Sequence, residues 1–355
     1  MGVSPSGADS ALRFAGGTSS NPARAVSRWK SLSGGKAAGS LPFFVPEEVL
    51  HASGMLPVTV WGDEYDRSAS SLPWKVLDAW VLPPVPGQPE PADLLPDAAS
   101  ALPRISLRFS SRSMKVPTTE EALDCVERLR DWAGECTGRP PTDGALGKSI
   151  RIFNENRRLF SVLGGRLASD PGTYLAREVC WLYRSAMALP REAHSELLRA
   201  ALSRGPAPEP GFRVKVFLGG RMVTTAAMEA IDAAGAAVVG EALAGGGRTP
   251  GSIDEERDPA LALARRLRTQ ILGWVEPDAE PSWATRELDR VEASGADRFL
   301  FLGAGAEPQD HCRKLAAEAE RRGIPFFCLE GDPSARFPER QAEEIARFLA
   351  PGEGH

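Results

Sequence analysis

Apolar and polar positions follow two different periods along this chain of 355 residues, and the first period is helical. In the section at residues 111–204, Thr118 and Glu121 have the spacing of a capping box at a helix start. Apolar residues then recur at helix spacing, at Leu123, Val126, Leu129 and Trp132. Further helices are predicted over residues 146–163, 174–187 and 191–202. This section is expected to be mainly α-helical, and Arg157 and Arg158 are interpreted as part of a solvated helix face.

After residue 211, short apolar runs alternate with helical segments. The runs RVKVFLGG, AAVVGEAL, RFLFLG and IPFFCLEG predict strands. Helices are predicted over residues 224–234, 259–272, 283–293, 312–322 and 339–349. This alternation indicates a parallel sheet with helices on both faces. Because right-handed crossovers bring the ends of parallel strands to one edge, the loops after these runs are expected to meet where open α/β sheets bind their ligands.

Changes in composition mark the domain boundaries. The first 37 residues are rich in Gly, Ser and Ala and lack an apolar period that would offset the entropy of ordering them. The stretch VLPPVPGQPEPADLLP, residues 81–96, favours an extended connector, and GPAPEPG, residues 205–211, marks a boundary. The expected units are a disordered tail at 1–37, an α/β domain with its connector at 38–110, the helical section at 111–204 and an α/β domain at 212–355.

Charge and cysteine content exclude several classes of protein. The formal net charge is −5 without a basic stripe, which argues against a nucleic-acid surface. No apolar run of membrane-spanning length and no secretory signal are found, so we expect a soluble cytoplasmic protein with no membrane partner. The five cysteines form no CxxC motif, which indicates free thiols and no zinc site. Cys125 and Cys180 fall in helical patterns and are expected to be buried.

Four segments together carry a resemblance to a known family. They are VPEEVLHASGMLPVTVWG, IRIFNENRRLF, RVKVFLGGRMVTTAAMEAIDAAGAAVV, and the stretch from GADRFLFL to GIPFFCLEGD. In this order they resemble a subunit of the 2-hydroxyacyl-CoA dehydratase and benzoyl-CoA reductase family, of which the 2-hydroxyglutaryl-CoA dehydratase D-component is an example. The resemblance extends over residues 38–350.

The resemblance implies an α/β fold with two flavodoxin-like parallel-sheet domains and a helical section between them. The first domain would be abbreviated, because the proline-rich connector takes the place of a strand and a helix. The resemblance also implies a pair of related subunits, an acyl-CoA substrate, and an ATP-dependent iron-sulfur activator. In such an enzyme a [4Fe-4S] cluster is held by cysteine thiolates, the soft ligands that suit it.

This chain has no thiolate at the positions that the resemblance assigns to the cluster. Ala244, in EALAGGGR, takes one position, Ala306, in GAEPQ, takes a second, and Ser70 takes the third by a looser match. These three residues are assigned to the acyl-CoA pocket, with Arg248 as a contact for a phosphate or thioester. We therefore expect no metal or cofactor on this chain, and a [4Fe-4S] cluster on a paralogous, cysteine-bearing partner subunit.

Other polar residues are candidates for chemistry, each with a structural alternative. Glu48 and His51 could act as acid and base near an acyl group, or could be a carboxylate at a helix start and a packed histidine. Gly219 and Gly220 could hold a CoA phosphate on backbone N–H groups, or could form a tight turn. His311 could contact the substrate or could cap a helix.

Two classes of function follow from the resemblance. The first is a cluster-free enzyme subunit that completes the acyl-CoA site of its partner and is not active alone. The alternative is a descendant without catalytic function that serves as a structural partner, an assembly factor or a binder of acyl thioesters. The intact PEEVLHASGMLP segment favours the first. A flavin enzyme is a third class, but no phosphate-loop sequence supports it.

Overall fold

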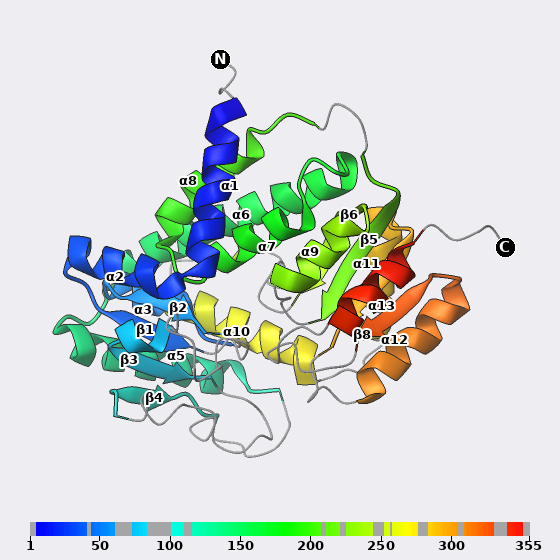
Figure 1. Ribbon diagram of the computed structural model, residues 1–355. Helices are drawn as coiled ribbons and strands as arrows, with labels where there is room; N and C mark the ends of the chain where they lie inside the picture. The colour runs from blue at the N-terminus through cyan, green and yellow to red at the C-terminus, as the bar shows by residue number, and fades with distance from the viewer. Residues whose placement is uncertain are drawn as a thin grey trace.

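The computed structural model describes residues 5–40, 44–60, 73–83, 101–109, 116–206, 211–220, 225–243, 252–255, 258–275, 283–303, 309–329 and 339–350. The strands in these ranges form two four-stranded parallel sheets (Figure 1). The first, in the order β2-β1-β3-β4, consists of β1 (Ala37–Ser40), β2 (Leu56–Thr59), β3 (Ala79–Leu82) and β4 (Arg104–Ser106). The second, in the order β6-β5-β7-β8, consists of β5 (Val214–Gly220), β6 (Ala236–Leu243), β7 (Arg298–Leu302) and β8 (Phe326–Leu329). Two flavodoxin-like parallel-sheet domains are therefore confirmed.

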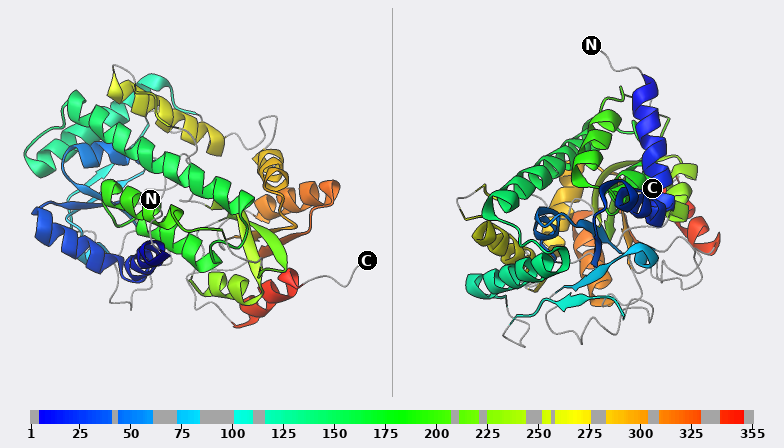
Figure 2. Two further views of the ribbon diagram at one scale, coloured as in Figure 1. Left: turned by 90° about the horizontal axis from the view of Figure 1, so that it is seen from above. Right: turned by 90° about the vertical axis from the view of Figure 1, so that its left-hand side faces the viewer.

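The helical section lies between the two sheets in the chain. It consists of α5 (Thr119–Thr137), α6 (Asp143–Ser169), α7 (Ala176–Ser185) and α8 (Arg191–Leu202). The predicted capping box is present, because Thr118 Oγ1 accepts from the Glu121 N–H at 3.2 Å and Glu121 accepts from the Thr118 N–H at 2.9 Å. Helix α6 runs along the molecule from α3 (Glu47–Ala52) to β6 (Figure 2). Its first half packs into the core of the first sheet, for example at Ile150, and its second half packs into that of the second sheet, for example at Leu163.

The expected disordered tail at residues 1–37 is wrong for its described part. That part forms two helices, α1 (Pro5–Ser20) and α2 (Pro22–Ser33). Leu12 of α1 is buried in the core that includes α7 and α8, and Val26 of α2 is buried beside the first sheet. The buried face of α1 is made largely of small residues. One of them, Gly16, packs so closely that a Cβ there would lie 3.0 Å from the Trp181 ring. Because alanine and glycine carry little apolar signal, the sequence pattern did not reveal this face.

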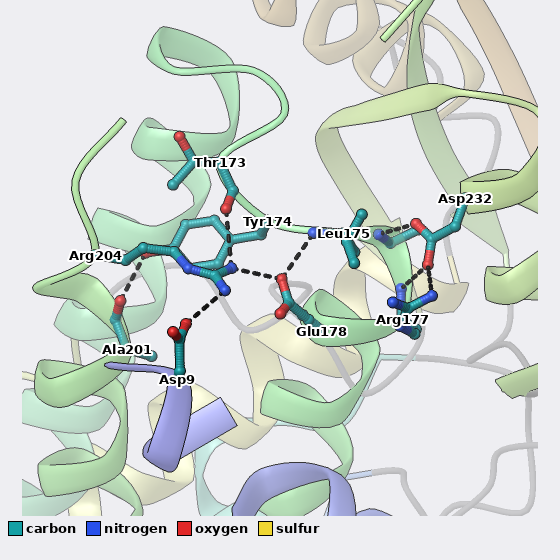
Figure 3. A network of polar contacts seen from close by, with 10 residues as sticks. Asp9, Thr173, Tyr174, Leu175, Arg177, Glu178, Ala201, Arg204 and Asp232 are labelled. Atoms are coloured by element: carbon teal, nitrogen blue, oxygen red, sulfur yellow. Dashed lines mark hydrogen bonds and ion pairs between the residues drawn. The ribbon is translucent and has the colours of Figure 1, made fainter. Parts of the chain in front are cut away.

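Polar contacts fasten α1 to the helical section and that section to α9 (Thr225–Ala233) (Figure 3). Arg204, just after α8, donates to Asp9 of α1 at 2.8 Å and to Glu178 of α7 at 2.7 Å. On the opposite side, Asp232 of α9, whose side chain is 7% exposed, accepts from the N–H of Ala176 at 2.6 Å, at the positive end of α7. Helix α7 therefore supports both the N-terminal helix and the second domain.

The described residues after β6 form further helices. They are α10 (Pro259–Val275), α11 (Trp283–Ser294), α12 (Gln309–Arg322) and α13 (Glu339–Leu349). Helix α10 packs against α5, where Leu263 shares a core with Val126 and the first sheet. Just before α10, Ile253 exchanges two hydrogen bonds of 2.8 Å with the Asn154 side chain of α6. The chain expected to form one domain at residues 212–355 therefore contributes to both cores.

Two expectations concern parts of the chain that are only partly described. The proline-rich connector at residues 81–96 is placed only at its start, at the end of β3 and the residue after it. Among the described helices, none is both long enough and apolar enough to cross a membrane.

Candidate active site

The first candidate residues lie on α3, which begins after Pro46 and packs against β2, α5 and α6. The side chain of Glu48 is 3% exposed, and its carboxylate forms an ion pair with Arg157 of α6. Arg157 is 18% exposed and also donates to Asn154 Oδ1 at 3.1 Å. The interpretation of Arg157 as a solvated side chain is therefore wrong, because α3 covers that face of α6. Its neighbour Arg158 is exposed, as predicted.

Glu48 and Arg157 line a small pocket that also involves α10. The other lining residues are Val45, Pro46, Leu263, Arg266, Leu267 and Gln270. Burial of Arg266, together with the nearby charge of Arg157, lowers the pKa of its guanidinium group. Two guanidinium groups and one carboxylate thus meet beside leucine side chains. This arrangement suits a ligand with an anionic or carbonyl oxygen group and an apolar part.

The other charged residues of α3 connect it to neighbouring elements. His51 does not line the pocket. Its Nδ1 lies 2.9 Å from Ser149 Oγ of α6, and its Nε2 lies 3.1 Å from Glu192 Oε1 of α8. The hydrogen bond with His51 lowers the pKa of the Glu192 carboxyl group. Glu47 forms an ion pair with Arg191 of α8. The structure thus separates the two predicted catalytic residues, with Glu48 in the pocket and His51 in a polar contact between helices.

A buried polar network between α6 and α8 was not predicted. His194 is fully buried, and its Nε2 lies 2.9 Å from the Leu182 carbonyl oxygen, so Nε2 carries the proton and donates. Its Nδ1 then accepts from Asn156 Nδ2 at 2.9 Å, and Asn156 Nδ2 also lies 3.0 Å from Ser195 Oγ. Burial lowers the pKa of His194 to about 3. The sequence signal that could have revealed this network is a polar residue at a core-facing position of each helix, Asn156 in α6 and His194 in α8.

Gly219 and Gly220 form the last two residues of strand β5 and not a turn before α9. They pair with β6 on one side and with β7 on the other. A Cβ on Gly219 would lie 2.6 Å from the Phe299 ring. Gly220 has a φ of 98°, and a Cβ there would lie 2.3 Å from the Leu302 carbonyl oxygen. Close packing of the strands thus accounts for both glycines.

We expect Gly220→Ala to reduce the free energy of unfolding by about 2–4 kcal/mol, through the positive φ and the backbone clash. Urea unfolding followed by circular dichroism measures this change. Gly164→Ala is the matched control, because no heavy atom lies near that Cβ position in α6, and alanine should stabilise the helix by about 0.5–1 kcal/mol. Equal effects of the two substitutions would contradict the assigned packing.

Of the remaining candidates, Ser70 was expected in the first domain, and the others were expected along the edge of the second sheet where its strands end. Ser70, Ala244, Arg248 and Ala306 lie outside the described residues. The backbone of His311 lies in the first turn of α12, and its side chain is not among those described.

The cysteines differ in part from the expectation of free thiols. Cys312 of α12 and Cys328 of β8 form a disulfide at this edge, so that expectation is wrong for this pair, which the fold brings together from two elements. Cys125, Cys136 and Cys180 are not in a disulfide, and Cys125 and Cys180 are buried as predicted.

The residue types at the positions given by the resemblance do not fit an iron-sulfur cluster. Alanine offers no ligand atom at two of the positions given by the resemblance, and serine offers no thiolate at the third. The two cysteines at the edge of the second sheet are bonded to each other. Across the described ranges, no group of three His, Cys, Asp or Glu residues is placed to hold a metal ion.

Comparison with known proteins identifies the family. The chain is 21% identical over 359 residues to the (R)-phenyllactyl-CoA dehydratase beta subunit of Clostridium sporogenes, covering 92% of this chain and 95% of that protein. It is 25% identical over 208 residues to a benzoyl-CoA reductase subunit of Thauera aromatica, covering 50% and 53%. A segment of 44 residues is 46% identical to the beta subunit of (R)-2-hydroxyglutaryl-CoA dehydratase of Acidaminococcus fermentans, covering 12% of this chain and 11% of that protein. The family model of the 2-hydroxyglutaryl-CoA dehydratase D-component matches residues 107–349, more than half of the chain. The chain therefore belongs to the 2-hydroxyglutaryl-CoA dehydratase D-component family, as its sequence resemblance predicted.

Proposed function

We propose that this chain is a cluster-free subunit of a 2-hydroxyacyl-CoA dehydratase or a benzoyl-CoA reductase-type complex. It completes an acyl-CoA site beside a paralogous subunit that carries a [4Fe-4S] cluster and receives electrons from an ATP-dependent activator. The observation that carries the proposal is the family match over residues 107–349. The full-length similarity to a dehydratase beta subunit supports the same assignment.

Two observations support a division of labour between subunits. Each of the relatives named above is one subunit of a dehydratase or a reductase, so the chain is expected to act together with a partner. The lack of thiolates at the positions given by the resemblance supports electron transfer by that partner. The part of this chain is then to bind and orient the substrate.

We place the contribution of this chain to the acyl-CoA site in the pocket of Glu48, Arg157 and Arg266. The ion pair holds the Glu48 carboxylate in a fixed position, and the guanidinium groups can donate hydrogen bonds to an acyl or thioester oxygen. The leucine side chains beside them suit the apolar part of the acyl group. Arg248 is a further proposed contact for a CoA phosphate.

Co-expression with a cysteine-bearing relative of the same family tests the assignment. We expect a stable heterodimer in which iron follows the relative, while this chain, purified alone without oxygen, holds substoichiometric iron. Size-exclusion chromatography and iron analysis of each chain measure both results. The proposal would be overturned if this chain stays monomeric and does not bind the relative. It would also be overturned by about four irons on this chain, which is the content of one [4Fe-4S] cluster.

Activity measurements on the same complex distinguish the two hypotheses, an enzyme subunit and a descendant without catalytic function. In the first case Glu48→Gln lowers acyl-CoA turnover or binding by the assembled complex. In the second case the heterodimer forms but turnover is unchanged by this substitution.

A further inference from the structure

Two cysteines from different elements meet where the strands of the second sheet end. Cys312 lies in the first turn of α12, and Cys328 is the third residue of β8. Their Cα atoms are 6.3 Å apart, within the range for a disulfide, and the two are bonded. Gly303, directly after β7, lies against the pair, and a Cβ there would be 3.7 Å from either sulfur atom. The cysteine pair therefore occupies the edge at which ligands of open α/β sheets bind.

The surroundings of this pair favour thiol chemistry. Cys312 is the fourth residue of the 14-residue helix α12, so the positive end of the helix stabilises its thiolate. Both cysteines are partly exposed, and a small thiol or disulfide can reach them. Cys125 provides the contrast, because burial raises the pKa of its thiol to about 11 and keeps it protonated. The two cysteines thus combine proximity, access and a stabilised thiolate.

We propose that Cys312 and Cys328 form a reversible dithiol/disulfide site that reacts with low-molecular-weight thiols and disulfides. The Cys312 thiolate attacks the S–S bond of a small disulfide, forms a mixed disulfide and releases one thiolate. The Cys328 thiolate then attacks the Cys312 sulfur, closes the protein disulfide and releases the second thiolate. The two protons lost by the cysteines are taken up by the two released thiolates. The small disulfide is reduced by the two electrons that the cysteine pair gives up.

Oxidation and reduction of this pair alter the attachment of one helix. The disulfide joins the start of α12 to β8 across a sequence separation of 16 residues. Reduction removes this covalent link between the helix start and the strand. The oxidised protein should therefore show slower amide hydrogen exchange in α12 than the reduced protein, by about tenfold or more. This inference does not rest on the proposed acyl-CoA function.

Redox titration of the full-length, folded protein tests the proposal. The protein is equilibrated with mixtures of reduced and oxidised glutathione, quenched in acid, alkylated and analysed by mass spectrometry. We expect Cys312 and Cys328 to change together in one two-electron transition, while Cys125 and Cys180 do not follow that transition. The proposal is overturned if both cysteines stay fully alkylated in oxidised glutathione. It is also overturned if the disulfide survives excess dithiothreitol in the native protein.

Two single variants test the order of attack. Cys328→Ser should leave Cys312 as a stable mixed disulfide with glutathione, because the resolving thiol is absent. Cys312→Ser should give several-fold less of such an adduct on Cys328. Cys136→Ser is the control, because it removes a thiol distant from the site in sequence and should leave the transition unchanged. Equal adduct formation in the first two variants would contradict the role given to Cys312.

Discussion

Glu48→Ala is expected to lower the free energy of unfolding by about 3–5 kcal/mol, because it leaves the Arg157 guanidinium group in a largely buried position without its carboxylate. Arg157 would keep only weaker partners, such as the 3.1 Å hydrogen bond to Asn154. Urea unfolding at neutral pH measures the loss. The double variant Glu48→Leu, Arg157→Met should recover most of it, because two apolar side chains of similar size leave no buried charge.

An exposed ion pair on α6, the helix that carries Arg157, provides the control for Glu48→Ala. Glu155 accepts hydrogen bonds from Arg158 and Arg199, and these partners lower the pKa of its carboxyl group to about 2. Because both arginines are more than half exposed, Glu155→Ala should cost only about 0–1 kcal/mol. A loss for Glu48→Ala as small as that for Glu155→Ala would show that the Glu48–Arg157 pair is not buried in solution.

Acid is expected to destabilise the protein through His194 well before most carboxylates are protonated. Burial lowers the pKa of His194 from 6.5 to about 3, so between these values the unfolded chain binds a proton that the folded chain does not. Stability is therefore unaffected by this residue above pH 6.5 and falls by about 1.4 kcal/mol per pH unit below it. From pH 6.5 to pH 4.5 the loss from His194 alone should be about 2 kcal/mol, because half of the unfolded chains are already protonated at pH 6.5.

His194→Gln isolates this contribution. Glutamine keeps one donor for the Leu182 carbonyl and one acceptor for Asn156, but it does not titrate. We expect the variant to be somewhat less stable than the wild type at pH 7.5 and to lose less stability between pH 6.5 and pH 4.5. The measurement is the urea midpoint at each pH. Parallel pH profiles for the two proteins would show that His194 can be protonated in the folded state.

Parallel pH profiles would also contradict the burial of the hydrogen-bond network formed by His194, Asn156 and Ser195. The network holds α6 and α8 in register, and these helices carry Arg157 and Arg191, the partners of the two glutamates of α3. A loosened network would therefore displace the pocket of Glu48. Stability at acid pH and geometry of the candidate site are connected through the same two helices.

Much of the fold could be predicted from local sequence patterns. The strands and helices after residue 211 follow from the alternation of apolar runs and helical segments, because burial on a sheet or on one helix face repeats within a few residues. The capping box of Thr118 and Glu121 was equally visible. The family also followed from the sequence, since four segments in a fixed order are specific together.

Other features could not be predicted because they depend on distant contacts. Helix α1 packs through alanine and glycine, whose small side chains give no clear period, and it is held by the ion pair of Asp9 with Arg204, which is 195 residues away. Gly219 and Gly220 were candidates for a phosphate contact or a tight turn, but both belong to strand β5, because the end of a strand depends on its neighbours in the sheet.

Local patterns and single residues were enough to establish the parallel α/β architecture and the family. Which polar groups meet depends instead on how the elements pack. Arg157 lies on a helix surface in sequence but is paired with Glu48, 109 residues away, because α3 covers it. Cys312 and Cys328 meet only because α12 packs against β8. Charge pairing and thiol chemistry depend on distances of a few ångströms, and such distances between remote residues are set by packing and not by sequence spacing.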